Sequence, residues 1–275
     1  MNKFSNLLLK HQVKLKYLLV FYGIYCAISL GTSWDEKYYQ IIGKINLDYL
    51  LSFGLLDENF DQKYRYSTLY WSLSSLLSQV VPNKYSIEIH HLINTLFGFL
   101  TIIGVYKITK KLFSTNVAKT ISVFLFFIPF FFGHFAINNK DTIITFAHVW
   151  IVYYLIKYTV KNFNFKKRFL IVFKISTLSA LGTGIQLLFM GSLIPIIMIF
   201  FINLFFFSRK KLKDALIDIL IYLIFFYLIL ILFWVDTHGN IFTYPFKFFL
   251  KTLSLNVGWP FNLINGSYIF SNEIP

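Results

Sequence analysis

Two adjacent carboxylates, Asp35 and Glu36, follow the first apolar run of the sequence and are flanked by three aromatic residues, Trp34, Tyr38 and Tyr39. A carboxylate at the edge of an apolar phase can be tuned to act as a general base. Aromatic rings beside it can stack on a sugar or a lipid head group. The segment therefore predicts catalytic carboxylates with aromatic substrate contacts. The alternative interpretation is an interfacial aromatic belt that ends in a charged stop.

A second polar group, His134, Asn138, Lys140 and Asp141, lies between two later apolar runs. The loop between these runs is short, so we expect its side chains to lie close to the membrane surface. We expect Lys140 to pair with a phosphate, and Asp141 to bind a cation or an acceptor hydroxyl. Alternatively, Asp141 is the N-cap of the helix that follows.

Histidines and other polar residues also occur at the edge of the apolar runs and inside them. His90 and His91 are adjacent, so on a helix they point about 100° apart and make poor joint metal ligands. We keep His91 as a candidate phosphate contact, although an interfacial role is the alternative. His148, Lys174 and Gln186 lie within apolar runs, where polar residues usually face the bundle interior, and Lys174 can also reach the nearer surface. No metal-binding motif is present.

The composition predicts a chain solvated by lipid. Of 275 residues, 57% are hydrophobic and 14% are charged, whereas soluble domains carry about 25% charged residues. The mean hydropathy is +0.63. The formal net charge is +14, but the basic residues form short clusters between apolar runs. That pattern is typical of cytoplasmic anchors rather than of a nucleic-acid-binding face.

The apolar runs predict an all-α polytopic membrane protein with about seven transmembrane helices, because one span needs about 20 residues. The stretch 169–207 is too long for one span, and the glycines at 182 and 184 are the natural place to divide it. The predicted spans are Tyr17–Leu30, His91–Tyr106, Val117–Phe132, Thr142–Lys157, Phe169–Gly184, Ile185–Phe207 and Ala215–Val235.

We expect one transmembrane domain over residues 1–275, with two long segments on its outer side. The first is an outer loop over 32–90 that carries amphipathic helices, notably at Tyr64–Val81, since so long a connection should be ordered. The second is an outer tail over 236–275. It has no closing helix, so we expect it to be truncated.

The charges predict the orientation. With the N-terminus in the cytoplasm, the inner segments hold 18 of the 26 Lys and Arg residues, as the positive-inside rule requires. Ten of the 12 acidic residues fall on the outer side. Acidic residues contribute little to topology, so their bias favours a site that faces outward.

Taken together, these features resemble the GT-C class of membrane glycosyltransferases, and within it the branch of the dolichyl-phosphate-mannose–protein mannosyltransferases and the bacterial aminoarabinose lipid A transferases. The shared order is a cytoplasmic N-terminus, one span, an Asp-Glu pair opening a long outer loop, and an acidic motif after the third span. That motif reads Asn-Pro-Lys-Asp in many bacterial members and Asn138-Asn139-Lys140-Asp141 here. Because Asn139 replaces the usual proline, we expect the loop backbone to differ.

The resemblance implies that Asp35 is the base that deprotonates an acceptor hydroxyl, which attacks the anomeric carbon of a polyprenyl-phosphate-linked sugar. Glu36 would support this site, Lys140 would hold the donor phosphate, and Asp141 would serve the acceptor side or a cation. The expected location is the bacterial plasma membrane, with lipid and the donor as partners and no nucleic acid. No cofactor is certain, and a divalent cation is possible at an acidic outer site.

Two other functions remain open. A transporter or lipid flippase would favour ionisable residues inside the membrane and broken helices, for which His148 and the break near Gly182 are the only support. An inactive membrane fragment, or a non-catalytic subunit, would fit a truncated chain.

Overall fold

The computed structural model describes residues 3–33, 35–54, 67–160, 163–206, 212–254, 261–264 and 267–270. These residues are mainly helical, which confirms the predicted helical class. The exception is a short antiparallel hairpin of β1 (Phe261–Ile264) and β2 (Ser267–Phe270), in which Phe261 pairs with Phe270. This hairpin was not predicted from the sequence.

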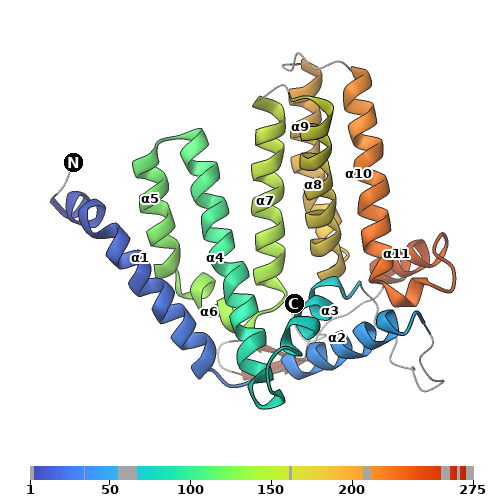
Figure 1. Cartoon of the computed structure of the whole chain (residues 1–275), viewed down its shortest axis with the longest axis horizontal. Helices are drawn as coiled ribbons and strands as arrows, with labels where there is room; N and C mark the ends of the chain where they lie inside the picture. Colours follow the sequence, from blue (N-terminus) through green and yellow to red (C-terminus); the bar gives the residue numbers. More distant parts are fainter. Residues whose placement is uncertain are drawn as a thin grey trace.

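The described residues form six helices of 18 residues or more. They run up and down through the molecule, with α1 tilted away from the rest (Figure 1). Four described segments are long and apolar enough to cross a membrane: residues 83–112, Asp141–Val160, Phe165–Ile185 and Lys213–Leu232. The number of seven spans stays a prediction. The helix break predicted at the glycines 182 and 184 lies a few residues later in the structure, between α8 and α9. The six helices are α1 (Lys3–Ser29), α4 (Ser86–Leu112), α7 (Asp141–Val160), α8 (Phe165–Ile185), α9 (Phe189–Phe206) and α10 (Leu212–Leu232).

The apolar run predicted at Val117–Phe132 forms a broken helix rather than a straight one. It consists of α5 (Thr115–Phe124), a 3-10 turn at Leu125–Phe127 and α6 (Pro129–Ile137), with a bend of 69°. Proline disfavours helical geometry in the residue before it, and Ile128 is accordingly extended, at φ −84° and ψ 105°. Counted as one span, this pair gives a fifth candidate.

Successive long helices run in opposite directions, so the polar segments between them gather at two ends of the bundle, which differ in charge. The end where α1 stops and α7 begins carries Asp35, Glu36, Glu88 and Asp141, and we call it the acidic end. The opposite end carries most of the lysines, and we call it the lysine-rich end. Two acidic residues at the lysine-rich end, Asp214 and Asp218, both contact Arg168 (Nη1–Oδ2 2.8 Å and Nε–Oδ2 3.1 Å).

Two shorter helices cover the acidic end. α2 (Glu36–Leu51) lies crosswise to the long helices and packs against α3 (Leu69–Ser78) (Figure 1). A 3-10 turn at Asn83–Tyr85 leads into α4. α3 falls within the predicted amphipathic stretch, whereas residues 55–66 lie outside the described part of the chain. Tyr39, Ile42 and Trp71 from these helices are buried in one cluster with Ile143 of α7 and Ile185 of α8. This cluster fixes α2 and α3 to the bundle.

Contacts further along the chain strengthen this attachment. The backbone N–H of Thr68 donates to the carbonyl of Phe233, just beyond α10, at 2.8 Å. A 3-10 turn at Val235–Thr237 and α11 (Tyr244–Ser254) follow, and Phe248 of α11 packs on buried Trp234 with ring centroids 5.8 Å apart. The acidic end is therefore a layer of packed helices.

Gly43 permits the close approach of α2 to α3, and this gives a testable prediction. A Cβ at position 43 would lie 2.5 Å from the carbonyl oxygen of Trp71 and 2.7 Å from its carbonyl carbon, which are backbone atoms that cannot rotate away. We expect Gly43→Ala to destabilise the protein by about 1–3 kcal/mol, despite the gain of up to about 1 kcal/mol in helix propensity. The measurement is thermal unfolding in detergent.

Gly191→Ala is the matched control, because a Cβ at that helical position meets no atom within 4 Å. Equal unfolding temperatures for the two variants would contradict the proposed tight contact between α2 and α3.

Candidate functional site at the acidic end

The two polar segments singled out in the sequence meet at the acidic end. The Lys140 Nζ donates to Asp35 Oδ2 at 3.0 Å, across 105 residues of chain. Both side chains reach the surface, with 38% of Lys140 and 53% of Asp35 exposed. Asp35 is held just before α2 and Lys140 just before α7. The site is therefore an exposed charge pair at the junction of the covering layer with the bundle.

Asn138 shapes the loop that presents Lys140. Its Oδ1 accepts from the backbone N–H of Lys140 at 3.1 Å and of Asp141 at 2.8 Å. These bonds satisfy N–H groups at the start of α7, which have no partner within the helix. The cap of α7 therefore comes from Asn138, and Asp141 is the first residue of the helix rather than its N-cap.

The same asparagine arranges His134 and Asp141. Because its Oδ1 accepts backbone N–H groups, the orientation of its amide is fixed and its Nδ2 must donate. Nδ2 donates to Asp141 Oδ2 at 2.9 Å and lies 3.1 Å from His134 Nδ1. A hydrogen bond there requires Nδ1 to accept, which places the proton of a neutral His134 on Nε2. His134 is half-buried and Asp141 is exposed.

Aromatic side chains form the floor beside the charge pair. Tyr39 is buried and stacks on Trp71 at 4.6 Å, and Lys140 Nζ lies 4.5 Å from the centre of the Tyr39 ring. Burial lowers the pKa of Lys140, but its hydrogen bonds to Tyr39 and Asp35 outweigh that effect and raise the pKa above its ordinary value.

Tyr38 is exposed and meets Tyr39 edge-on. Trp34 lies outside the described residues.

Glu36 and His91 lie beneath this surface instead of on it. Glu36 is 4% exposed and His91 is 0% exposed, and Glu36 Oε1 lies 2.7 Å from His91 Nε2. Glu36 Oε2 accepts from the backbone N–H of Ser33 at 2.9 Å. His91 Nδ1 is 2.9 Å from the carbonyl oxygen of Ala27, so Nδ1 must donate. These residues join α1, α2 and α4, and we assign them a positioning role.

Three residues that were not predicted from the sequence hold the two segments together. Ser33 Oγ donates to the carbonyl of Ile137 at 3.3 Å. Asn94 Nδ2 donates to the carbonyl of Ala136 at 3.2 Å, and Tyr70 donates to Asn94 Oδ1 at 3.3 Å. The sequence held a signal for Asn94. It lies inside an apolar run, where a polar residue usually faces the bundle interior, and it follows His91 by about one helical turn, so both side chains lie on the same face of the helix.

No protein-family model, curated protein or solved structure matches this chain. Its function must therefore be argued from the site itself. Within the described part of the chain, no three His, Cys, Asp or Glu side chains are grouped so that they could hold a metal ion. The divalent cation stays a prediction, and Lys140 already supplies a positive charge beside Asp35.

The buried Glu36–His91 contact gives a second prediction. Glu36→Ala would leave buried polar groups of His91 and Ser33 without their partner, and we expect a loss of about 3 kcal/mol in stability. Glu36→Gln should recover much of this loss, because its amide can donate to a neutral His91 and accept from Ser33. Thermal unfolding of both variants tests the assignment, and a Glu36→Ala protein as stable as the parent would refute it.

The raised pKa of Lys140 gives a third prediction. A raised pKa in the folded state means that the protonated amine favours folding, so the contribution is complete below the ordinary value of 10.5 and is lost as pH rises through the folded value. The difference in unfolding temperature between the parent and Lys140→Gln should stay constant from about pH 7 to about pH 10 and shrink above that. Lys37→Gln, an exposed neighbour on α2, controls for net charge. A difference that already vanishes near neutral pH would contradict the pair.

Proposed function

We propose that this chain is an integral membrane glycosyltransferase of the GT-C type, which moves a sugar from a polyprenyl-phosphate donor to a hydroxyl of a protein, lipid or glycan. The observation that carries the proposal is the meeting of Asp35 and Lys140 at 3.0 Å on an exposed surface at the acidic end. A base and a cation side by side suit a reaction that takes a proton from one partner and leaves a phosphate on the other.

In the proposed reaction, Asp35 accepts the proton of the acceptor hydroxyl. The hydroxyl oxygen forms a bond to the anomeric carbon from the face opposite the phosphate, while the bond from that carbon to the phosphate oxygen breaks. The lipid phosphate leaves with the bonding electrons, and the configuration at the anomeric carbon inverts. Positioning of this kind accounts for much of the rate of group-transfer enzymes.

Lys140 stabilises the negative charge that develops on the leaving phosphate, as a preorganised cation does in such reactions. Its contact with Asp35 is compatible with this role, because a bound donor phosphate would compete for the amine and leave the carboxylate ready to accept a proton. Asp141, Asn138 and His134 form the adjoining polar wall, where an acceptor or a cation would bind. Tyr38 is exposed beside them and suits contact with a sugar ring.

The proposed topology has seven spans, formed by α1, α4, the bent α5–α6 pair, α7, α8, α9 and α10. The N-terminus lies in the cytoplasm of a bacterium and the acidic end faces out of the plasma membrane. The support is the clustering of lysines at the opposite end, since cytoplasmic ends of membrane proteins carry an excess of Lys and Arg. A donor carried by a membrane lipid would then meet its acceptor at the outer surface.

Sugar transfer in membranes that contain this chain tests the proposal. With a radiolabelled polyprenyl-phosphate sugar as donor, we expect Asp35→Asn to lower the rate by about 100-fold or more, because general bases contribute on that scale. Unfolding temperature should hardly change, since Asp35 is half exposed. Asp48→Asn, a carboxylate later on α2, is the matched control and should keep full activity.

Equal transfer by the parent and by Asp35→Asn would exclude Asp35 as the base. Absence of transfer from every polyprenyl-phosphate donor tried, with a correctly folded parent, would favour an inactive membrane subunit. Repeating the assay with EDTA tests for a divalent cation.

A further inference from the structure

Lys174 is a charged residue in the middle of a membrane-spanning helix. It is the tenth of 21 residues in α8, which places its Cα about 14 Å along the axis from Phe165. Its side chain is nevertheless exposed on the surface of the bundle. An ionisable group at this depth is costly in lipid, and such groups usually pair with a specific charged partner or line a substrate pathway.

A groove of about 350 Å³ runs beside Lys174, between α4, α7 and α8. Leu100, Phe146, Phe173 and Leu178 form its apolar wall, so it suits a hydrocarbon chain. The indole Nε1 of Trp150 donates to the carbonyl of Leu100 at 3.0 Å and joins α4 to α7 there. The groove is therefore a feature built between packed helices.

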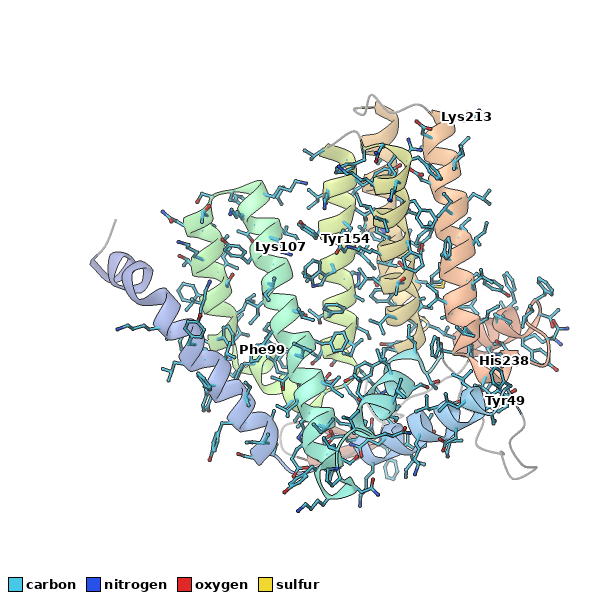
Figure 2. The ribbon with its side chains drawn as sticks, viewed as in Figure 1. Tyr49, Phe99, Lys107, Tyr154, Lys213 and His238 are labelled. Carbon is cyan, nitrogen blue, oxygen red and sulfur yellow. The ribbon has the colours of Figure 1, made fainter. Side chains whose placement is uncertain are left out.

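Two lysines, one from α4 and one from α8, contact the same aromatic cluster of α7. Lys107 Nζ of α4 lies 4.7 Å from the centre of a Trp150 ring, and Lys174 Nζ of α8 lies 5.4 Å from the Tyr154 ring. The rings of Trp150 and Tyr154 are themselves 5.8 Å apart. Figure 2 shows Lys107 and Tyr154 at a similar height on neighbouring helices. Both ammonium groups therefore contact one aromatic platform, and Trp150, Tyr154 and Lys174 also line the groove.

The depth of this platform fits a lipid phosphate. Lys107 lies about 8 Å, and Tyr154 about 9 Å, from the ends of their helices at the lysine-rich end. The long side chain of Lys174 brings its Nζ from mid-helix to within 5.4 Å of the Tyr154 ring, as lysines in membranes reach toward the nearer surface. Neither lysine forms an ion pair with a carboxylate in the described ranges, where the acidic groups of this end, Asp214 and Asp218, contact Arg168. The positive charge is therefore available to an anion.

We propose that the groove binds an anionic phospholipid of the adjacent leaflet, with its phosphate at Lys107 and Lys174 and an acyl chain along the apolar wall. Basic pockets between membrane helices bind such head groups. A polyprenyl phosphate in use at the acidic end would carry its phosphate at the other end of the bundle. The proposal goes beyond sugar transfer and stands or falls independently of it.

Native mass spectrometry of the delipidated full chain tests the site, with phosphatidylglycerol as probe and phosphatidylcholine of the same acyl chains as the zwitterionic control. We expect phosphatidylglycerol to bind more tightly, and Lys174→Gln or Lys107→Gln to weaken it by about fivefold each. Lys174→Arg should retain binding. Lys166→Gln, an exposed lysine in the first turn of α8, is the matched control and should bind like the parent.

Equal affinity for the two phospholipids, or equal weakening by Lys166→Gln, would overturn the site. Binding of undecaprenyl phosphate with the same dependence on Lys174, together with displacement of phosphatidylglycerol, would assign the groove to the polyprenyl lipid instead. Circular dichroism of each variant confirms that the helices are intact, so that a lost ligand is not mistaken for a lost fold.

Discussion

The acidic end depends on a carboxylate that is buried where water cannot solvate it. Glu36 can occupy that position only because both of its oxygens have partners, His91 and the backbone of Ser33. A buried charge without partners is strongly destabilising, so this contact constrains three elements together. It fixes the end of α1 through Ala27, the start of α2 through Glu36, and the buried face of the first turns of α4 through His91. The exposed neighbour Asp35 is thereby placed opposite Lys140 without needing strong contacts of its own.

This arrangement divides the Asp-Glu pair into two different tasks. Adjacent residues on a helix point about 100° apart, so at the start of α2 one carboxylate turns to the surface and the other turns into the protein. The surface pair of Asp35 and Lys140 is partly hydrated and contributes little to stability, which leaves it free to change partners during a reaction. The buried Glu36–His91 contact holds the helices in place, and the exposed Asp35–Lys140 pair can exchange its partners for a substrate.

Much of the fold could be predicted from the sequence, because apolar runs of about 20 residues and clusters of lysine carry a strong signal. The break predicted from the glycines at 182 and 184 lies a few residues later in the structure, between α8 and α9, and α3 falls within the amphipathic stretch predicted at 64–81. The 69° bend was missed, because the run Val117–Phe132 was interpreted as one apolar span although Pro129 signals a break within it. That Asp35 and Lys140 serve one site was implied only by the resemblance to the GT-C class. Which of Asp35 and Glu36 is buried could not be predicted, because it depends on His91 and Ser33, which lie at that depth only after α1, α2 and α4 have packed.

The short helix α6 ends inside the protein, and its last carbonyl groups are satisfied from outside the helix. Thr142 donates to His134, Asn94 to Ala136 and Ser33 to Ile137, so three separate elements hold one helix terminus. The loop that follows has only the residues from Asn138 to Lys140 with which to reach the start of α7. Insertion or deletion of a single residue there would turn Lys140 away from Asp35 and uncouple the cap made by Asn138. The length of this loop is therefore as constrained as the residue types of Asn138 and Lys140.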